Sequence, residues 1–138
     1  MALLELARLQ QPYEAAVNAK ISSHRVVVEG KYTLYTVQVT VDTYAWTVER
    51  RYKDFDILDQ QRFPDRSQSF LPPKKVVGNL DLEFINERKS ELNKYMAALL
   101  AKEIEHQKQL GANSFSMPVA RFFDFHEYVS QFVRNLTG

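Results

Sequence analysis

A strict alternation of apolar and polar side chains between residues 35 and 41 constrains this chain more than any other feature. The apolar side chains that share one face of this segment are Tyr35, Val37, Val39 and Val41. The threonine and glutamine residues between them share the other face. A period of two is typical of a β-strand with one face buried and the other exposed to water. The segment therefore predicts a strand that needs a second layer to cover its apolar face.

Similar segments flank this strand on both sides. Residues 26–28 are three β-branched valines, and the Glu29-Gly30 pair after them is a turn signal. Asp42-Thr43 predicts a tight turn into a third alternating segment at residues 44–48, which carries Tyr, Trp and Val on one face. Strands joined by such short turns form an antiparallel meander.

The period becomes helical after Arg50. Phe55 and Leu58 have the spacing of a helix face, and we expect Asp54, Asp56 and Asp59 to face water. A polar loop follows, and the Pro72-Pro73 pair must be extended because proline fixes its own φ and restricts the residue before it.

Two further helices are expected towards the C-terminus. The apolar stripe of the longer one consists of Ile85, Leu92, Met96 and Leu99. Pro118 is suited to the first turn of a closing helix, whose expected core side chains are Val119, Phe122, Phe123 and Phe125. The sequence thus predicts an α+β fold, in which a three-stranded antiparallel sheet packs on a helical subdomain of three to four helices.

Composition excludes several classes of function. The 138 residues are 45% hydrophobic and 25% charged, as expected for one globular domain. Cysteine is absent, and the three histidines lack neighbouring ligands at a metal-binding spacing. No nucleotide-binding or nucleophile-elbow motif is present. We therefore expect no enzyme activity, no metal and no cofactor. The net charge of +1 argues against nucleic acid as the partner.

Positive charge gathers in three places. Arg50, Arg51 and Lys53 follow the third strand, Lys74 and Lys75 follow the two prolines, and Arg88-Lys89 lies on the long helix. Arg88 falls along the apolar stripe of that helix. A charge there lines a pocket for an anion or forms a structural ion pair, for instance with an aspartate of the preceding helix. Spacing leaves both interpretations open.

Two neighbouring features are equally ambiguous. Tyr52 could be a core aromatic that anchors the junction between strand and helix, or a flat ring that stacks on a sugar or inositol bound by arginine. Val76 and Val77 could be buried, or could form a loop that dips into a lipid interface after the two lysines.

Three motifs in this order resemble one family. They are Arg50-Arg51-Tyr52-Lys53-Asp54-Phe55, Leu71-Pro72-Pro73-Lys74, and Glu87-Arg88 ahead of Leu92-Asn93-Lys94-Tyr95-Met96. Together they resemble the PX (phox homology) domain over roughly residues 21–126. The segment from Leu71 to Asn79 is most similar to PX modules of kinase-like, kinesin-like and sorting-nexin proteins.

The resemblance implies a basic pocket that binds phosphatidylinositol 3-phosphate. By position in the motifs, Arg51 resembles the arginine that binds the 3-phosphate, and Tyr52 the tyrosine whose ring packs against the inositol. Lys74 matches the lysine that reaches the 1-phosphate, and Arg88 the arginine that holds the 4- and 5-hydroxyls. No metal or cofactor is implied.

The resemblance also implies a membrane-facing surface. Val76 and Val77 would lie in a loop that inserts into the bilayer, and Lys53 and Lys75 would add attraction to anionic lipids. The expected function is a phosphoinositide-binding module for trafficking or sorting. It would be cytoplasmic and would target its parent protein, as a peripheral protein, to the cytosolic face of early endosomes.

The expected domain boundaries follow from the extent of the resemblance. Residues 1–19 are expected to be a helical arm or linker, residues 20–126 the PX domain, and residues 127–138 a helical tail. Exposed leucines in the arm suggest an alternative function. In that alternative, the chain is a protein-interaction module with a weak or vestigial lipid site, and either a helical surface or the arm binds a protein partner.

Overall fold

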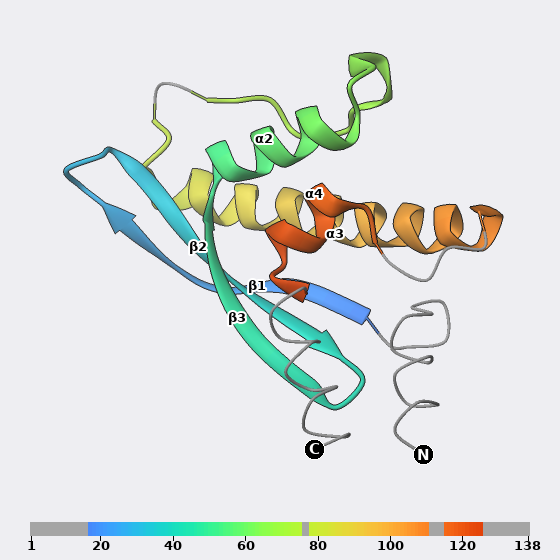
Figure 1. Cartoon of the computed structure of the whole chain (residues 1–138). Helices are drawn as coiled ribbons and strands as arrows, with labels where there is room; N and C mark the ends of the chain where they lie inside the picture. Colours follow the sequence, from blue (N-terminus) through green and yellow to red (C-terminus); the bar gives the residue numbers. More distant parts are fainter. Residues whose placement is uncertain (1–16, 76–77, 111–114, 126–138) are drawn as a thin grey trace.

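The structure is a computed structural model that describes residues 17–75, 78–110 and 115–125. Its elements, in chain order, are β1 (Val17–Val27), β2 (Tyr32–Val41), β3 (Tyr44–Arg51), α2 (Tyr52–Arg62), the 3₁₀ turn η1 (Arg66–Gln68), α3 (Leu82–Leu110) and α4 (Met117–Phe122). The three strands form one antiparallel sheet in the order β1-β2-β3, and the helices gather on one side of it (Figure 1). The predicted α+β fold is therefore confirmed.

The central strand has the pattern that its sequence predicts. Every second side chain of β2 is buried, from Thr33 to Val41. The turn into β3 places Asp42 at a φ of 53°, a left-handed conformation that aspartate tolerates better than most residues. The buried face of β2 is the one that the helices cover.

The first strand starts earlier than the sequence suggested. β1 begins at Val17, three residues before the domain boundary predicted at residue 20, and Val17 and Ala19 pair with Val41 and Val39 of β2. The pattern was hard to see because the register shifts between Ile21 and Ser23, which interrupts the alternation. The backbone N–H of Ile21 donates instead to the side chain of Asn93 on α3, at 2.8 Å. Residues 1–16 of the predicted arm and the predicted tail lie outside the described residues.

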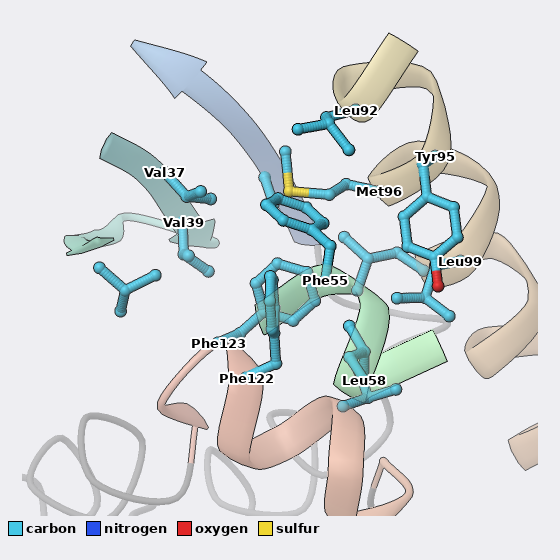
Figure 2. Close-up of a cluster of buried hydrophobic side chains, with 14 of the residues drawn as sticks. Val37, Val39, Phe55, Leu58, Leu92, Tyr95, Met96, Leu99, Phe122 and Phe123 are labelled. Carbon is cyan, nitrogen blue, oxygen red and sulfur yellow. The ribbon is translucent and has the colours of Figure 1, made fainter. Parts of the chain in front are cut away.

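The core fills the space between the sheet and the helices. Figure 2 shows Phe55 of α2 beside side chains of α3, with Val37 and Val39 of the sheet to the left and Phe122 and Phe123 below. The rings of Phe55 and Phe122 meet edge to face at a centroid distance of 4.8 Å. The predicted stripe of α3 and the predicted apolar residues after Pro118 are all buried.

Two carboxylates are buried within this helical layer. Asp59 was expected to face water, and that prediction is wrong: its side chain is 0% exposed and accepts hydrogen bonds from the hydroxyls of Tyr95 and Ser69 and from Arg66. Asp59 lies one turn after Phe55, on the side of α2 that faces α3. Burial, together with the hydrogen bond to Asp59, raises the pKa of the Tyr95 hydroxyl far above its usual value. That hydroxyl therefore remains a donor at neutral pH.

The second buried carboxylate ties α4 to the long helix. Glu103 of α3 is 1% exposed and accepts from Arg62 of α2 and from both the backbone N–H and the hydroxyl of Ser116. These bonds satisfy its buried oxygens and fix the start of α4 beside α2 and α3.

Replacing Asp59 with alanine should lower the free energy of unfolding by about 2 to 4 kcal/mol, because three donors lose their shared buried acceptor. Urea denaturation followed by circular dichroism measures this change. Asp56→Ala removes a half-buried carboxylate from the same helix, and it should cost well under about 1 kcal/mol. Equal losses in the two variants would show that the Asp59 cluster has no special role in stability.

Candidate functional site

The junction between β3 and α2 directs two adjacent arginines to opposite sides. Successive side chains of a strand alternate between the faces of a sheet. Arg50 points towards the helices, where its Nε donates to the carbonyl of Phe122 at 2.9 Å and its guanidinium lies 3.4 Å from Asp124. Arg51 turns away from them, and its guanidinium carbon lies 3.7 Å from the centre of the Tyr32 ring. Of the two arginines, only Arg51 lines the main pocket.

The loop after η1 returns along α2 towards the turn between β1 and β2 (Figure 1). Two backbone carbonyls of this loop are held by side chains from different helices. The hydroxyl of Tyr52 donates to the carbonyl of Pro72, and Arg88 of α3 donates to the carbonyl of Pro73 at 2.7 Å. Lys74 and Lys75 follow as exposed side chains. The side chain of Asn79 reaches the carbonyl of Lys31 in the β1–β2 turn.

These segments enclose a pocket of about 420 Å³. Its lining residues are Lys31, Tyr32, Thr33, Tyr35, Arg51, Tyr52, Lys53, Asp56, Lys74, Lys75, Asn79, Phe84 and Arg88. The structure thus brings together Arg51, Tyr52, Lys53, Lys74, Lys75 and Arg88, the six described residues to which the sequence assigned a role. Val76 and Val77, the predicted insertion residues, lie outside the described residues.

Arg88 is the most deeply buried cation of the pocket, with 4% of its surface exposed. Its guanidinium carbon lies 4.5 Å from the ring centre of Tyr52 and 4.8 Å from that of Phe84. Spacing left two interpretations of Arg88 open, a pocket for an anion and a structural ion pair, and the structure shows features of both. It lines the pocket, and its Nε lies 3.6 Å from Glu91 of its own helix rather than beside an aspartate of α2.

Arg88 retains unused hydrogen-bonding capacity. Within the described part of the chain, its buried Nε and Nη1 have no hydrogen-bond partner. A buried charged donor that lacks an acceptor costs free energy, and a bound anion or hydroxyl would remove that cost.

Tyr52 is neither a core aromatic nor a free surface ring. It is half-buried, it contacts Arg88 with its ring, and its hydroxyl supports the loop at Pro72. Burial raises the pKa of its hydroxyl above the ordinary value, with a smaller opposing effect from Arg88. The hydroxyl is therefore protonated at neutral pH and can donate to the Pro72 carbonyl.

Sequence reasoning missed the pocket residues that come from β2 and its preceding turn. Lys31, Tyr32 and Thr33 reach the site only because β2 lies beside β3, so no local pattern marks them. The hydroxyl of Thr33 is buried and has no partner among the described residues. Phe84 could have been found, because it precedes Arg88 by four residues and so shares its helix face. Asp56 was assigned to solvent, yet it is half-buried and lines the pocket.

The electrostatics of the pocket favour an anion. Of the lining residues that the structure describes, six are lysine or arginine and one, Asp56, is acidic. Arginine and lysine donors around a cavity of this kind suit a phosphate group, which accepts several charge-assisted hydrogen bonds. Over the described ranges, no cluster of three or more His, Asp or Glu side chains could hold a metal ion. No helix within those same ranges has the length and apolar character of a membrane span.

Comparison with protein families decides the identity of this fold. The family model described as "PX domain" matches residues 38–115, more than half of the chain. The chain belongs to the PX domain family. The fold agrees: an X-ray structure of a designed CISK-PX domain superimposes with a TM-score of 0.57 and 28% identity, and it covers 77% of this chain and 97% of that one.

Relatives of this PX domain occur within much longer proteins. A rat PX domain-containing protein kinase-like protein is 35% identical over 96 residues, which are 67% of this chain but 16% of the relative. Rat sorting nexin-20 is 32% identical over 109 residues, covering 73% of this chain and 34% of that protein. Human Kinesin-like protein KIF16B is 36% identical over 84 residues, which are 56% of this chain and 6% of that protein. The chain thus spans about a third or less of each relative's length.

Membership of this family has a direct consequence for function. A PX domain is a lipid-binding module that binds phosphoinositides and targets proteins to membranes. The kinase-like relatives share only the PX region with this chain, so their names imply no catalysis here.

The two adjacent arginines should have separable effects. Arg50→Ala should lower the free energy of unfolding by about 1 to 2 kcal/mol, because it removes the bonds to Phe122 and Asp124. It should leave phosphoinositide binding by the folded fraction within about twofold of wild type, since Arg50 does not line the pocket. Arg51→Ala should leave stability nearly unchanged and should remove binding. Thermal unfolding and vesicle sedimentation measure the two effects, and loss of binding in both variants would contradict this assignment.

Proposed function

We propose that this PX domain binds phosphatidylinositol 3-phosphate and thereby targets its parent protein to the cytosolic face of early endosomes, in membrane trafficking or sorting. The observation that carries the proposal is that Arg51, Tyr52, Lys74 and Arg88 line one pocket although they come from three separate segments of the chain. These four residues are also the ones that the family resemblance assigns to this headgroup.

Arg51 is suited to the 3-phosphate. Its guanidinium contacts the face of Tyr32, and among the described residues no carboxylate forms an ion pair with it. Its N–H groups can therefore bind two oxygens of a phosphomonoester side by side.

Arg88 and Asp56 are suited to select against further phosphates. Arg88 donates to the Pro73 carbonyl and contacts the rings of Tyr52 and Phe84. Its Nη1 has no hydrogen-bond partner among the described residues, and we assign this donor to the hydroxyls at positions 4 and 5. A phosphate at either position would need more room. Asp56, which lines the same pocket, would also repel it. Both effects disfavour bisphosphates relative to the monophosphate.

The exposed lysines are suited to the membrane side of the pocket. Lys74 can reach the 1-phosphate, which joins the inositol to the lipid, while Lys53 and Lys75 attract anionic lipids by about 1 kcal/mol each near the surface. Val76 and Val77 follow these lysines directly in the sequence, so we also propose that they insert into the bilayer.

Sedimentation with vesicles that carry each phosphoinositide in turn, at one salt concentration, tests the proposal. We expect selective sedimentation with phosphatidylinositol 3-phosphate and its loss in Arg51→Gln. Arg121→Gln is the matched control, because this exposed arginine of α4 does not line the pocket and should bind like wild type.

Other outcomes would contradict the proposal in distinct ways. Equal sedimentation with every anionic lipid would reduce the pocket cations to a nonspecific basic patch. No sedimentation with any lipid would support the alternative, in which a protein partner binds the N-terminal arm.

Replacing Val76 and Val77 with serine should weaken vesicle binding by about tenfold, because roughly 1 kcal/mol or less of interfacial burial is lost for each valine. Binding of a soluble short-chain phosphatidylinositol 3-phosphate, measured by isothermal titration calorimetry, should not change. A parallel fall in both affinities would mean that the valines support the pocket and do not insert.

A further inference from the structure

The ring of Tyr32, in β2, contacts the arginine at the end of the neighbouring strand. The sheet register pairs Leu34 with Arg51, so Tyr32, two residues earlier in β2, is the diagonal neighbour of Arg51 on the same face. The guanidinium carbon lies 3.7 Å from the centre of the Tyr32 ring, a distance at which the planar group and the aromatic face are in van der Waals contact. Both residues line the pocket.

Gly30, in the turn before β2, lies directly against the same ring. A Cβ atom at this position would lie 2.4 Å and 2.7 Å from two carbons of the Tyr32 ring. Real side chains do not approach so closely, so any other residue here would displace the ring. With glycine at this position, the turn leaves room for the ring in the orientation that contacts Arg51.

This arrangement holds a guanidinium without using its hydrogen bonds. A carboxylate that fixed Arg51 would occupy the N–H groups that a phosphate needs, and it would compete with the ligand for them. An aromatic face contacts the flat side of the guanidinium and leaves the N–H groups at its edge available. Among the described residues, the ring is the contact that the Arg51 side chain makes in place of an ion pair.

We propose that Tyr32, seated on Gly30, is a positioning residue that orients the Arg51 guanidinium for phosphate. The inference rests on the proposed function in one respect, that Arg51 binds the 3-phosphate. It adds that the β1–β2 turn, which is remote in sequence from the three basic motifs, sets the affinity of the site.

Three variants test the stack against a soluble dibutanoyl phosphatidylinositol 3-phosphate, titrated by calorimetry so that no bilayer contributes. Tyr32→Phe keeps the aromatic face and should bind within about twofold of wild type. Tyr32→Leu keeps apolar bulk without that face and should bind about five- to tenfold more weakly. Gly30→Ala, which leaves both side chains of the stack intact, should also weaken binding, by about threefold or more.

A matched control and a spectroscopic readout separate positioning from a general loss of structure. Tyr44→Leu removes an exposed tyrosine at the start of β3, outside the pocket lining, and it should bind like wild type. The NMR resonance of Arg51 Nε–H should show a ring-current shift in wild type and Tyr32→Phe, and should lose it in Tyr32→Leu.

Specific results would overturn the inference. Wild-type affinity in Tyr32→Leu would mean that Arg51 needs no ring. Equal losses in Tyr32→Phe and Tyr32→Leu would mean that the phenolic hydroxyl binds the ligand itself. Unchanged binding in Gly30→Ala would mean that Tyr32 does not need a glycine at position 30 to orient Arg51. Failure of the proposed function differs from all of these, because wild type itself would then not bind this lipid.

Discussion

The pocket depends on a direct transition from strand to helix at Arg51 and Tyr52, with no residue between β3 and α2. The backbone N–H of Arg51 donates to the carboxylate of Asp54 at 2.8 Å, which caps the first turn and fixes the direction in which the helix leaves the sheet. Because the chain turns there, three consecutive side chains point in three directions. Arg50 joins the helical layer, Arg51 meets Tyr32, and Tyr52 supports the loop.

Two side chains that line the pocket also support the loop that forms one of its walls. Tyr52 and Arg88 each donate to a carbonyl of the Pro72-Pro73 segment, and each lines the pocket. The prolines have no backbone N–H and a fixed φ, so their carbonyls present a stiff edge to these donors. These two hydrogen bonds hold the Pro72-Pro73 segment in place without a ligand, which lowers the entropic cost of binding at this part of the pocket.

Much of this fold can be read from the sequence, because the relevant signals are local. The alternation of β2 and the apolar stripe of α3 predict the layers that the structure has. The start of β1 was missed because a shift in register breaks its alternation. The burial of Asp59 was missed because its partners, Ser69 and Tyr95, are distant in sequence, and isolated polar residues are assigned to water by default.

Some walls of the pocket could be predicted from the sequence and one could not. The residues from β3, the proline loop and α3 were found because their motifs are contiguous in sequence. The wall formed by Lys31, Tyr32 and Thr33 was not, since only strand pairing brings it to Arg51. The sequence motifs reveal the basic residues of the pocket. They do not reveal Tyr32, the ring that we propose orients Arg51.

The unused donors of Arg88 have a consequence for the lifetime of the protein. In the empty pocket, Nη1 of Arg88 has no hydrogen-bond partner among the described residues and Nε has only the ion pair with Glu91, so the unoccupied domain gives up part of its folding free energy. Any ligand that binds only the folded state shifts the folding equilibrium towards it by mass action. The membrane-bound domain would then open less often than the free one and present fewer sites to proteases. The lipid would set how long each copy of the protein survives as well as where it resides.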